Sequence, residues 1–410
     1  MKYWLTLFLF CIGTAGFCQS HDLRFYINTA QQNSPTLKEY QNGILSAQID
    51  SQVLRATLRP QVAFIGSGSY APIISGWGYD EAITNIANLT GIIQANKTFV
   101  SNGRLGAQLQ TIALQRRALL DTIQLSEQDL VRTITDQYIT AYGNLLVADY
   151  NREVFELMQR EEIILKKLTQ SSVYKQTDYL TFYVTMQQQE LTYLQAQIQY
   201  NTDYLTLGYL AGIVDTTIRR IEKPIVPDTV STDLSASVFT RRYITDSLRL
   251  ANERTLIDYE YKPRLGYYAD AGYNSSLQVT PYKNFGFSAG ISLTIPLYDG
   301  RQKQMKYAQL DLRERTRQSN RAFFIAQHTQ QSAQLRQQLQ SIDLLVKKIQ
   351  QQIDYSYTLI TANGKLLEVG EITMKDYITA VNNYLAARNT MTQNELTRLR
   401  ITNQLRYWNR

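Results

Sequence analysis

The sequence has little cysteine, histidine or proline: its 410 residues include 2 Cys, 2 His and 8 Pro. Zinc clusters, catalytic triads built on histidine and frameworks of disulfide bonds all need more Cys or His than this chain provides. Charged residues are also scarce, at 19% of the chain, and the formal net charge is only +7. No run of Lys and Arg resembles a nucleic-acid-binding tract, so we expect no nucleic acid among the partners.

Long apolar runs are missing except at the N-terminus. Met1-Lys2 precedes a stretch from Trp4 to Phe17 that is almost wholly apolar, and polar residues follow Cys18. This pattern predicts a secretory signal peptide that is cleaved after Cys18. A lipid on Cys18 is the alternative, although Phe17 stands where lipidation signals have a small residue. Elsewhere no apolar stretch reaches the length of about 18 residues that predicts a helical membrane span.

Three short motifs occur twice, in the same order, about 200 residues apart. The pairs are 58–62 with 261–265, 99–104 with 297–301, and 177–180 with 375–378. One such pair is weak evidence, but three in order predict an internal duplication. We therefore expect a signal peptide over 1–18, a first repeat over 19–212, a linker over 213–233 and a second repeat over 234–410.

Each repeat is expected to run helix, strand, strand, long helix and shorter helix. The expected helices are 22–58 (interrupted at Asn33-Ser34-Pro35), 104–168, 177–210, 234–261, 301–367 and 373–408. A heptad seam of apolar residues in the second long helix predicts side-by-side helix packing. Its members are Leu335, Leu339, Ile342, Val346, Ile349, Ile353 and Ile360. The Gln-rich flanks of this seam fit either a solvated coiled-coil face or the wall of an aqueous conduit.

The expected strands, 61–70, 92–100, 264–273 and 284–297, alternate between apolar and polar residues. The alternation is clearest in the last strand, where Phe287 and Ile291 lie on one face and Ser288 and Ser292 on the other. Transmembrane strands of about 9–11 residues show this pattern, with the apolar face toward lipid. A half-buried sheet covered by helices shows it as well.

A sheet that lies in a membrane must close into a barrel. Four strands cannot close a barrel, and lipid does not tolerate an open strand edge. The barrel must then be shared between chains, and three chains give twelve strands, enough to leave a pore.

The order of elements and three motifs resemble the TolC family of outer-membrane efflux proteins. The motifs are Asn33-Ser34-Pro35-Thr36-Leu37, the segment 293–300 (LTIPLYDG) and the segment 369–378, which contains Val369-Gly370-Glu371 and Asp376-Tyr377-Ile378. The resemblance covers essentially the whole chain after the signal peptide. It implies a mainly α-helical chain with membrane β-strands, and a homotrimer that forms a 12-stranded β-barrel and a long periplasmic α-helical barrel.

The resemblance also implies a function and partners. The protein would be the channel, or exit duct, of a tripartite efflux or secretion system in the outer membrane of a Gram-negative bacterium, extending into the periplasm. Its partners would be a periplasmic adaptor (membrane fusion) protein, an inner-membrane pump or ATP-driven exporter, and outer-membrane lipid. No cofactor is implied. Drug, metal-ion and protein cargo use the same conduit, so the cargo stays open.

In that family the breaks between long and returning helices form the periplasmic tip, which narrows the channel and docks the adaptor. Here the tip would comprise 171–178 and 368–376. The implied gate residues are Asp376, Glu371, Glu368 and Asp178, and the implied adaptor contacts are Val369, Gly370, Ser172 and Tyr174. Asp376 matches the first of two constriction aspartates known in some members, whereas Thr379 occupies the second position.

A physical argument for the gate stands beside the resemblance. Glu368, Glu371 and Asp376 from three chains would place up to nine carboxylates around one axis, and such a ring favours cations. The alternatives are a solvated acidic helix end for Glu368 and Glu371, and helix capping for Asp376.

Two other classes of protein fit the sequence less well. An enzyme would need a constellation of reactive side chains, but His328 is isolated, and the pair Glu161-Glu162 is expected to be solvated surface. A periplasmic coiled-coil adaptor or structural protein is the alternative to the channel. It would explain the helices and the export signal, but not the paired alternating strands.

Overall fold

The computed structural model describes residues 22–79, 87–227, 237–277 and 280–408. The expected signal peptide lies outside these ranges, as does part of the expected linker. The chain divides into two compact units, each built from segments that are far apart in sequence. Unit 1 comprises 1–35, 127–232 and 328–410, and unit 2 comprises 36–126 and 233–327. Each unit therefore contains parts of both expected repeats.

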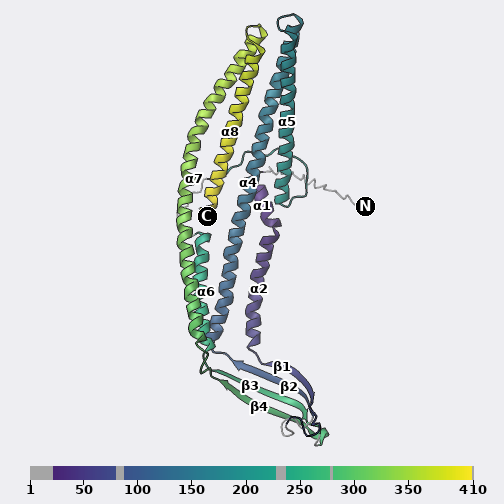
Figure 1. Cartoon of the computed structure of the whole chain (residues 1–410), viewed down its shortest axis with the longest axis vertical. Helices are drawn as coiled ribbons and strands as arrows, with labels where there is room; N and C mark the ends of the chain where they lie inside the picture. The colour runs from purple at the N-terminus through teal and green to yellow at the C-terminus, as the bar shows by residue number, and fades with distance from the viewer. Residues whose placement is uncertain (1–21, 80–86, 228–236, 278–279, 409–410) are drawn as a thin grey trace, which may run out of the picture. The chain divides into compact units, whose positions relative to one another are not determined.

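Unit 2 contains an antiparallel sheet of four strands in the order β1-β2-β3-β4 (Figure 1). The strands are β1 (Gln61–Tyr70), β2 (Ala87–Phe99), β3 (Arg264–Ser275) and β4 (Phe285–Thr294). All four expected strands are confirmed, with changes of boundary in β2, β3 and β4. β2 begins five residues earlier than expected, at Ala87, and β4 ends at Thr294. β4 stops there because Pro296 has no backbone N–H to donate to the ladder.

Four helices of unit 2 connect to the strands. They are α2 (Pro35–Thr57), α6 (Val238–Glu260) and the first parts of α4 (Asn102–Gln170) and α7 (Gln302–Glu368). α2 and α6 end shortly before Pro60 and Pro263, which cannot continue a helix. α4 and α6 approach closely at Gly103, where an added Cβ would lie 1.9 Å from the Tyr259 hydroxyl. A larger residue at position 103 would have to displace the Tyr259 side chain.

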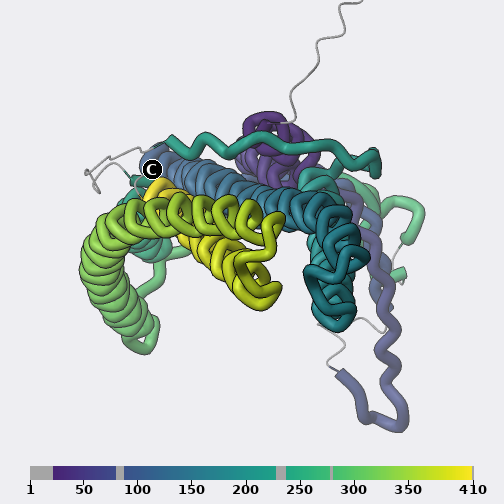
Figure 2. The backbone as a smooth tube through the Cα atoms, turned by 90° about the horizontal axis from the view of Figure 1, so that it is seen from above, coloured from purple at the N-terminus to yellow at the C-terminus, as the bar shows by residue number. Residues whose placement is uncertain are grey.

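Unit 1 contains α1 (Leu23–Asn33), α5 (Gln176–Leu210), α8 (Met374–Trp408) and the remaining parts of α4 and α7. Within this unit, α7 lies beside α8, α8 beside α4, and α4 beside α5 (Figures 1 and 2). One hydrogen bond illustrates each contact: Arg398 to Asp343 joins α8 to α7, Asn403 to Asp136 joins α8 to α4, and Gln189 to Asn151 joins α5 to α4. None of the helices among the described residues is long and apolar enough to span a membrane.

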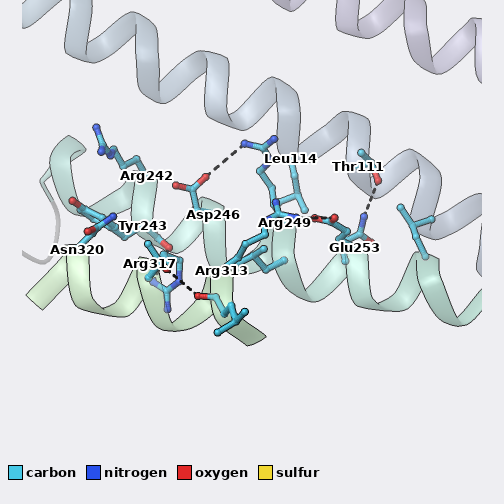
Figure 3. Close-up of a pocket in the computed structure, with 15 residues that line it drawn as sticks. Thr111, Leu114, Arg242, Tyr243, Asp246, Arg249, Glu253, Arg313, Arg317 and Asn320 are labelled. Atoms are coloured by element: carbon cyan, nitrogen blue, oxygen red, sulfur yellow. Dashed lines mark hydrogen bonds and ion pairs between the residues drawn. The ribbon is translucent and has the colours of Figure 1, made fainter. Parts of the chain in front are cut away.

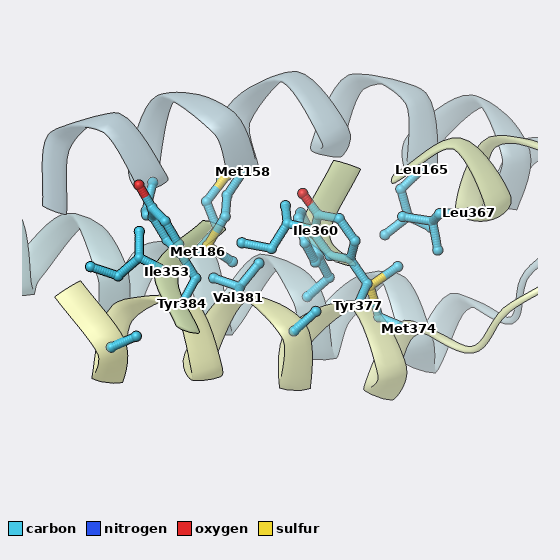
Figure 4. Packing of buried hydrophobic residues seen from close by; sticks show 14 of the residues in the cluster. Met158, Leu165, Met186, Ile353, Ile360, Leu367, Met374, Tyr377, Val381 and Tyr384 are labelled. Atoms are coloured by element: carbon cyan, nitrogen blue, oxygen red, sulfur yellow. The ribbon is translucent and has the colours of Figure 1, made fainter. Parts of the chain in front are cut away.

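The largest core of unit 1 lies between these four helices (Figure 4). Met158, Phe182, Ile360, Leu367 and Tyr377 are among its most buried side chains. Burial of a large apolar side chain stabilises a fold by about 1.5–3 kcal/mol, so this core holds the four helices together. The heptad seam predicted from the sequence is confirmed in part here, because Ile349, Ile353 and Ile360 all belong to the core.

Candidate functional site

The sheet of unit 2 has two chemically different faces. Cross-strand pairing aligns Phe64 with Ile93, Ile93 with Ala271, and Ala271 with Phe287, so one face is apolar across all four strands. The side chains of this face are solvent-exposed, for example Phe287 at 89% and Ile291 at 78%. Such a face is incompatible with a helix packed over it within unit 2. The half-buried sheet, the alternative left open by the sequence, is therefore not what the described residues form.

The opposite face of the sheet is polar. The Ser288 hydroxyl donates to Asp270 Oδ2 at 2.7 Å, and the Thr90 hydroxyl donates to Asn274 Oδ1 at 3.2 Å. These bonds link neighbouring strands through side chains that prefer water to hydrocarbon. The alternation predicted for β4, with Phe287 and Ile291 opposite Ser288 and Ser292, is confirmed.

Unit 1 ends in two turns that contact each other. The first turn (171–175) connects α4 to α5, and the second turn (369–373) connects α7 to α8. Ser172 and Gly370 occupy equivalent positions in the left-handed region, with φ of 64° and 78°. A Cβ added at Gly370 would lie 2.9 Å from Val173 Cγ1, so the two turns pack directly against each other.

Backbone hydrogen bonds give both turns the same helix-ending motif. Val173 N donates to Leu168 O at 2.9 Å, and Glu371 N donates to Leu366 O at 2.9 Å. Ser172 N also donates to Thr169 O, and Gly370 N to Leu367 O, each at 3.1 Å. Together these bonds form the Schellman arrangement, which usually has Gly at the left-handed position. The first turn has Ser172 instead, and a side chain in this conformation costs about 1–2 kcal/mol.

Tyr174 joins the first turn to the second. Its hydroxyl donates toward Leu367 O at 3.1 Å and Ile372 O at 2.9 Å. Burial is the first cause that raises the pKa of the Tyr174 hydroxyl, and the charge of Asp178 is the second. The side chain suggested by the resemblance as an adaptor contact is therefore half-buried and makes a bond between the two turns.

Asp376 caps α8. Its Oδ2 accepts from the Thr373 hydroxyl at 2.6 Å and from Thr373 N at 3.2 Å, while Asp376 N donates to Thr373 Oγ1 at 3.3 Å. This reciprocal pattern is a capping box, and its hydrogen bonds lower the pKa of the Asp376 carboxyl. Asp178 is at the equivalent position of α5, but Lys175 stands in place of Thr373 and makes no side-chain cap.

The remaining gate and adaptor residues lie around the two turns. Glu368, Val369, Gly370, Glu371 and Asp376 are exposed on the second turn and its flanks. On the first turn Ser172 is exposed, and on its flank Asp178 is half-buried. The structure thus brings the predicted residues of both repeats together in one region of unit 1. Their roles as gate or adaptor contacts stay predictions.

The expectation that Glu161-Glu162 is solvated surface is wrong. Tyr179 donates a hydrogen bond to Glu162 Oε1 at 2.6 Å. Glu161 Oε2 and the Tyr377 hydroxyl are buried and, within the described part of the chain, have no hydrogen-bond partner. Burial and then the charge of Glu368 raise the pKa of the Glu161 carboxyl, against the opposing effect of Arg160. Packing of α4 against α7 and α8 leaves Glu161 half-buried, and no local sequence pattern reports such packing.

Sequence reasoning also missed an exposed apolar stripe on α5. Its members are Leu180, Val184, Leu191, Ile198 and Leu205, which are 39–65% exposed. At about 100° per residue, the stripe lies opposite the buried face that holds Phe182 and Leu207. A second exposed stripe, Leu345, Tyr355, Leu359 and Leu366, runs along α7. The seven-residue spacing from Val184 to Leu205 is the signal that could have revealed the first stripe.

A cavity of about 560 Å³ lies between α4, α6 and α7 of unit 2 (Figure 3). Several arginines line it, but carboxylates compensate most of their charge. Arg313 bonds to Glu253 at 2.8 Å, and Arg317 bonds to Glu314 at 2.6 Å and to Tyr243 O at 3.1 Å. Among the described residues, no group of three or more His, Cys, Asp or Glu side chains could hold a metal ion.

Comparison with solved structures reveals the same fold in bacterial membrane proteins. The outer membrane protein VceC from Vibrio cholerae superposes with a TM-score of 0.75 at 13% identity, covering 94% of this chain and 96% of that one. The CmeC outer membrane channel from Campylobacter jejuni gives 0.73 at 12% identity, covering 95% and 86%. The open state of the MtrE outer membrane channel from Neisseria gonorrhoeae gives 0.73 at 13%, covering 94% and 88%.

No protein-family model and no curated protein sequence matches the chain. The likeness to solved structures therefore carries the assignment, and at this level of identity it establishes the fold. The similar structures are channels and membrane proteins rather than enzymes. Mostly helical, with one small antiparallel sheet, this chain has the fold of the TolC-like outer-membrane channels.

Proposed function

We propose that this protein is an outer-membrane channel, the exit duct of a tripartite efflux or secretion system, located in the outer membrane of a Gram-negative bacterium and extending into the periplasm. The observation that carries the proposal is the sheet of unit 2, whose exposed apolar face and polar opposite face suit contact with lipid on one side and water on the other. The protein acts as a passive conduit and not as an enzyme.

The sheet and the helices both support assembly into a trimer. Within the part of the chain that the structure describes, β1 and β4 each pair with one neighbour, and lipid does not tolerate the open edges that this leaves. The exposed stripes on α5 and α7 give unit 1 two different apolar surfaces, as head-to-tail association into a ring requires. Three copies provide twelve strands, enough for a pore. An internal duplication accounts for the recurrence of the same element order in both halves.

Labelling of introduced cysteines tests the membrane sheet. Cysteines at Phe287 and Ile291 are expected to face lipid, and cysteines at Ser288 and Ser292 to face water. The predicted mature chain has no other thiol, because both native cysteines, Cys11 and Cys18, belong to the expected signal peptide. A membrane-impermeant thiol reagent should label only the second pair in reconstituted vesicles. Equal labelling of both pairs, or complete release of the protein by high salt, would favour the periplasmic coiled-coil alternative.

The two turns of unit 1 are proposed as the periplasmic tip. Glu368, Glu371 and Asp376 would form the acidic gate together with Asp178, and Val369 and Gly370 would contact the adaptor, with Ser172 and Tyr174 beside them. The exposure of Val369, at 66%, supports such a contact. Capping and gating by Asp376 are compatible, since a carboxylate whose pKa is lowered by hydrogen bonds keeps its negative charge at neutral pH.

Single-channel recordings with a matched pair of variants test the gate. We expect the parent channel to be cation-selective and blocked from the tip side by divalent cations. Glu371→Ala should weaken the block without disturbing the capping box, whereas Asp376→Ala should weaken the block and also loosen the start of α8. If Asp376→Ala loosens α8 while the block of both variants equals that of the parent, the carboxylates are caps and surface charges only.

A further inference from the structure

The connections between strands and helices lie at one end of the sheet. Phe99 of β2 pairs with Leu265 of β3, and Arg264 of β3 pairs with Thr294 of β4. Gln61, where β1 begins, pairs with Asn96 near the end of β2. The connections to α2, α4, α6 and α7 are therefore neighbours along one edge, which we call the helix-side end of the sheet.

Five basic side chains gather at or near these connections and define a surface that we call the basic rim. Its members are Arg59, Lys97, Arg104, Lys262 and Arg301. Among the described residues, none of the five forms an ion pair with a carboxylate. From the first turn of α7 the pattern changes, because Lys303 pairs with Asp258 at 2.9 Å and Lys306 with Glu260 at 2.6 Å.

The one carboxylate within the connecting segments is already engaged. Asp299 accepts from Arg301 N at 2.9 Å and from Lys303 N at 2.7 Å, and so caps the start of α7. The five cations of the rim therefore outnumber the carboxylate of the connecting segments. At the opposite end of the sheet, Lys283 is the one basic residue that the structure describes near the strand ends. The two ends of the sheet therefore differ strongly in charge.

Aromatic rings accompany the rim cations. The Lys262 ammonium lies 4.2 Å from the centre of the Tyr259 ring, and the Lys97 ammonium lies 5.6 Å from that of Phe99. Lys97 belongs to the apolar face of the sheet, where it pairs across the strands with Tyr267. A lysine at the border of an apolar face extends its ammonium toward the membrane–water interface, where Tyr and Trp are also enriched.

Contacts also place Arg104 near this group. The Tyr259 ring packs against Gly103, so the start of α4 lies beside the end of α6. Arg104 follows Gly103 directly, while Lys262 stacks on Tyr259 itself. The helix-side end therefore combines an apolar strand face, interfacial aromatic rings and several cations that form no ion pair with any carboxylate in the described ranges.

We propose that the basic rim binds the phosphate groups of anionic glycerophospholipids in the leaflet next to the helices. The proposal rests on the channel function, because it requires the apolar face of the sheet to lie in a bilayer. The charge of the rim is complementary to lipid phosphate, and each basic side chain near an anionic surface strengthens binding roughly fivefold. The rim thus selects lipids by charge and holds the barrel at a defined depth.

Spin-labelled lipids in reconstituted vesicles test the rim. The parent trimer is reconstituted into phosphatidylcholine vesicles that contain a trace of spin-labelled phosphatidylglycerol or of spin-labelled phosphatidylcholine. Electron spin resonance then gives the relative affinity of the lipid bound to the protein. The parent should prefer phosphatidylglycerol several-fold, and 1 M NaCl, with a Debye length of about 3 Å, should weaken this preference. The triple variant Lys97→Gln, Lys262→Gln, Arg301→Gln should lose it.

Arg264→Gln is the matched control. Arg264 lies at the same end of the sheet, but it belongs to the polar face and donates a hydrogen bond to Glu260 O at 3.1 Å. Its substitution should leave the lipid preference unchanged. A preference that survives in the triple variant, or that falls equally in Arg264→Gln, overturns the proposal.

The same experiment separates failure of the rim from failure of the channel. If the parent binds both probes equally and still conducts ions in planar bilayers, the rim proposal is wrong and the channel stands. If the parent immobilises neither probe, the protein is not embedded in the bilayer, and both proposals are wrong.

Discussion

Loss of a single hydroxyl at Tyr174 should loosen the contact between the two turns. The Tyr174→Phe substitution keeps the ring and its packing but removes the bonds toward Leu367 O and Ile372 O, at 3.1 and 2.9 Å. One hydrogen bond contributes about 0.5–1.5 kcal/mol net. Since the side chain is only half-buried, water can replace part of the loss, and we expect about 1 kcal/mol. That corresponds to a roughly fivefold increase in the equilibrium constant for local opening.

Amide hydrogen exchange measures this opening directly. The informative amides are those of Gly370 and Glu371, which donate to Leu367 O at 3.1 Å and to Leu366 O at 2.9 Å. They should exchange about five times faster in Tyr174→Phe than in the parent. Tyr183→Phe is the matched control. It also removes one tyrosine hydroxyl, but from a ring that stacks on Tyr179 within α5. Unchanged exchange in Tyr174→Phe, or equal acceleration in the control, would refute the reasoning.

Three further changes have defined outcomes. Gly370→Ala should destabilise the second turn by about 1–2 kcal/mol, and Ser172→Gly should stabilise the first turn. Amide exchange should therefore become faster in the second turn of the first variant and slower in the first turn of the second variant. Exchange rates that change in the same direction in both variants would contradict this. Because the folded-state pKa of Glu161 is raised, its protonation should stabilise the turns as the pH falls through that raised pKa toward the ordinary glutamate value, and Glu161→Gln should remove this contribution in denaturation measured against pH. Val184→Glu with Ile198→Glu should dissociate the trimer in analytical ultracentrifugation, but Thr181→Glu, on the flank of the stripe, should not.

Strand faces were predictable because the side-chain period of a strand is fixed at two. Once Phe287 and Ser288 were assigned to a strand, their opposite orientation followed without knowledge of the fold. The start of β2 was less accessible, since Asn88 and Thr90 give its first residues little apolar character. They belong to the strand because Asn88 pairs with Ser69 of β1, and Thr90 pairs with Asn274 of β3, a residue distant in sequence.

Some contacts of the candidate site also form between residues close in sequence, and others between residues far apart. The capping box of Thr373 and Asp376 is local, and the position of Asp376 at the start of the returning helix already indicated capping as an alternative. The bond from Tyr174 to the second turn and the burial of Glu161 depend on packing between segments nearly 200 residues apart. No local pattern reports such contacts, which is why Glu161 was assigned to the surface.

The two turns are equivalent in position but unequal in chemistry, and this predicts which one opens first. The second turn has Gly370 at its left-handed position and a capping box at the start of α8. The first turn has Ser172, which is strained there, and α5 begins without a side-chain cap at Lys175. Both differences weaken the first turn, so amides at the start of α5 should exchange faster than those at the start of α8. Lys175→Thr, which recreates a capping box with Asp178, should reduce the difference, and equal exchange in the parent would show that contacts between the turns outweigh these local terms.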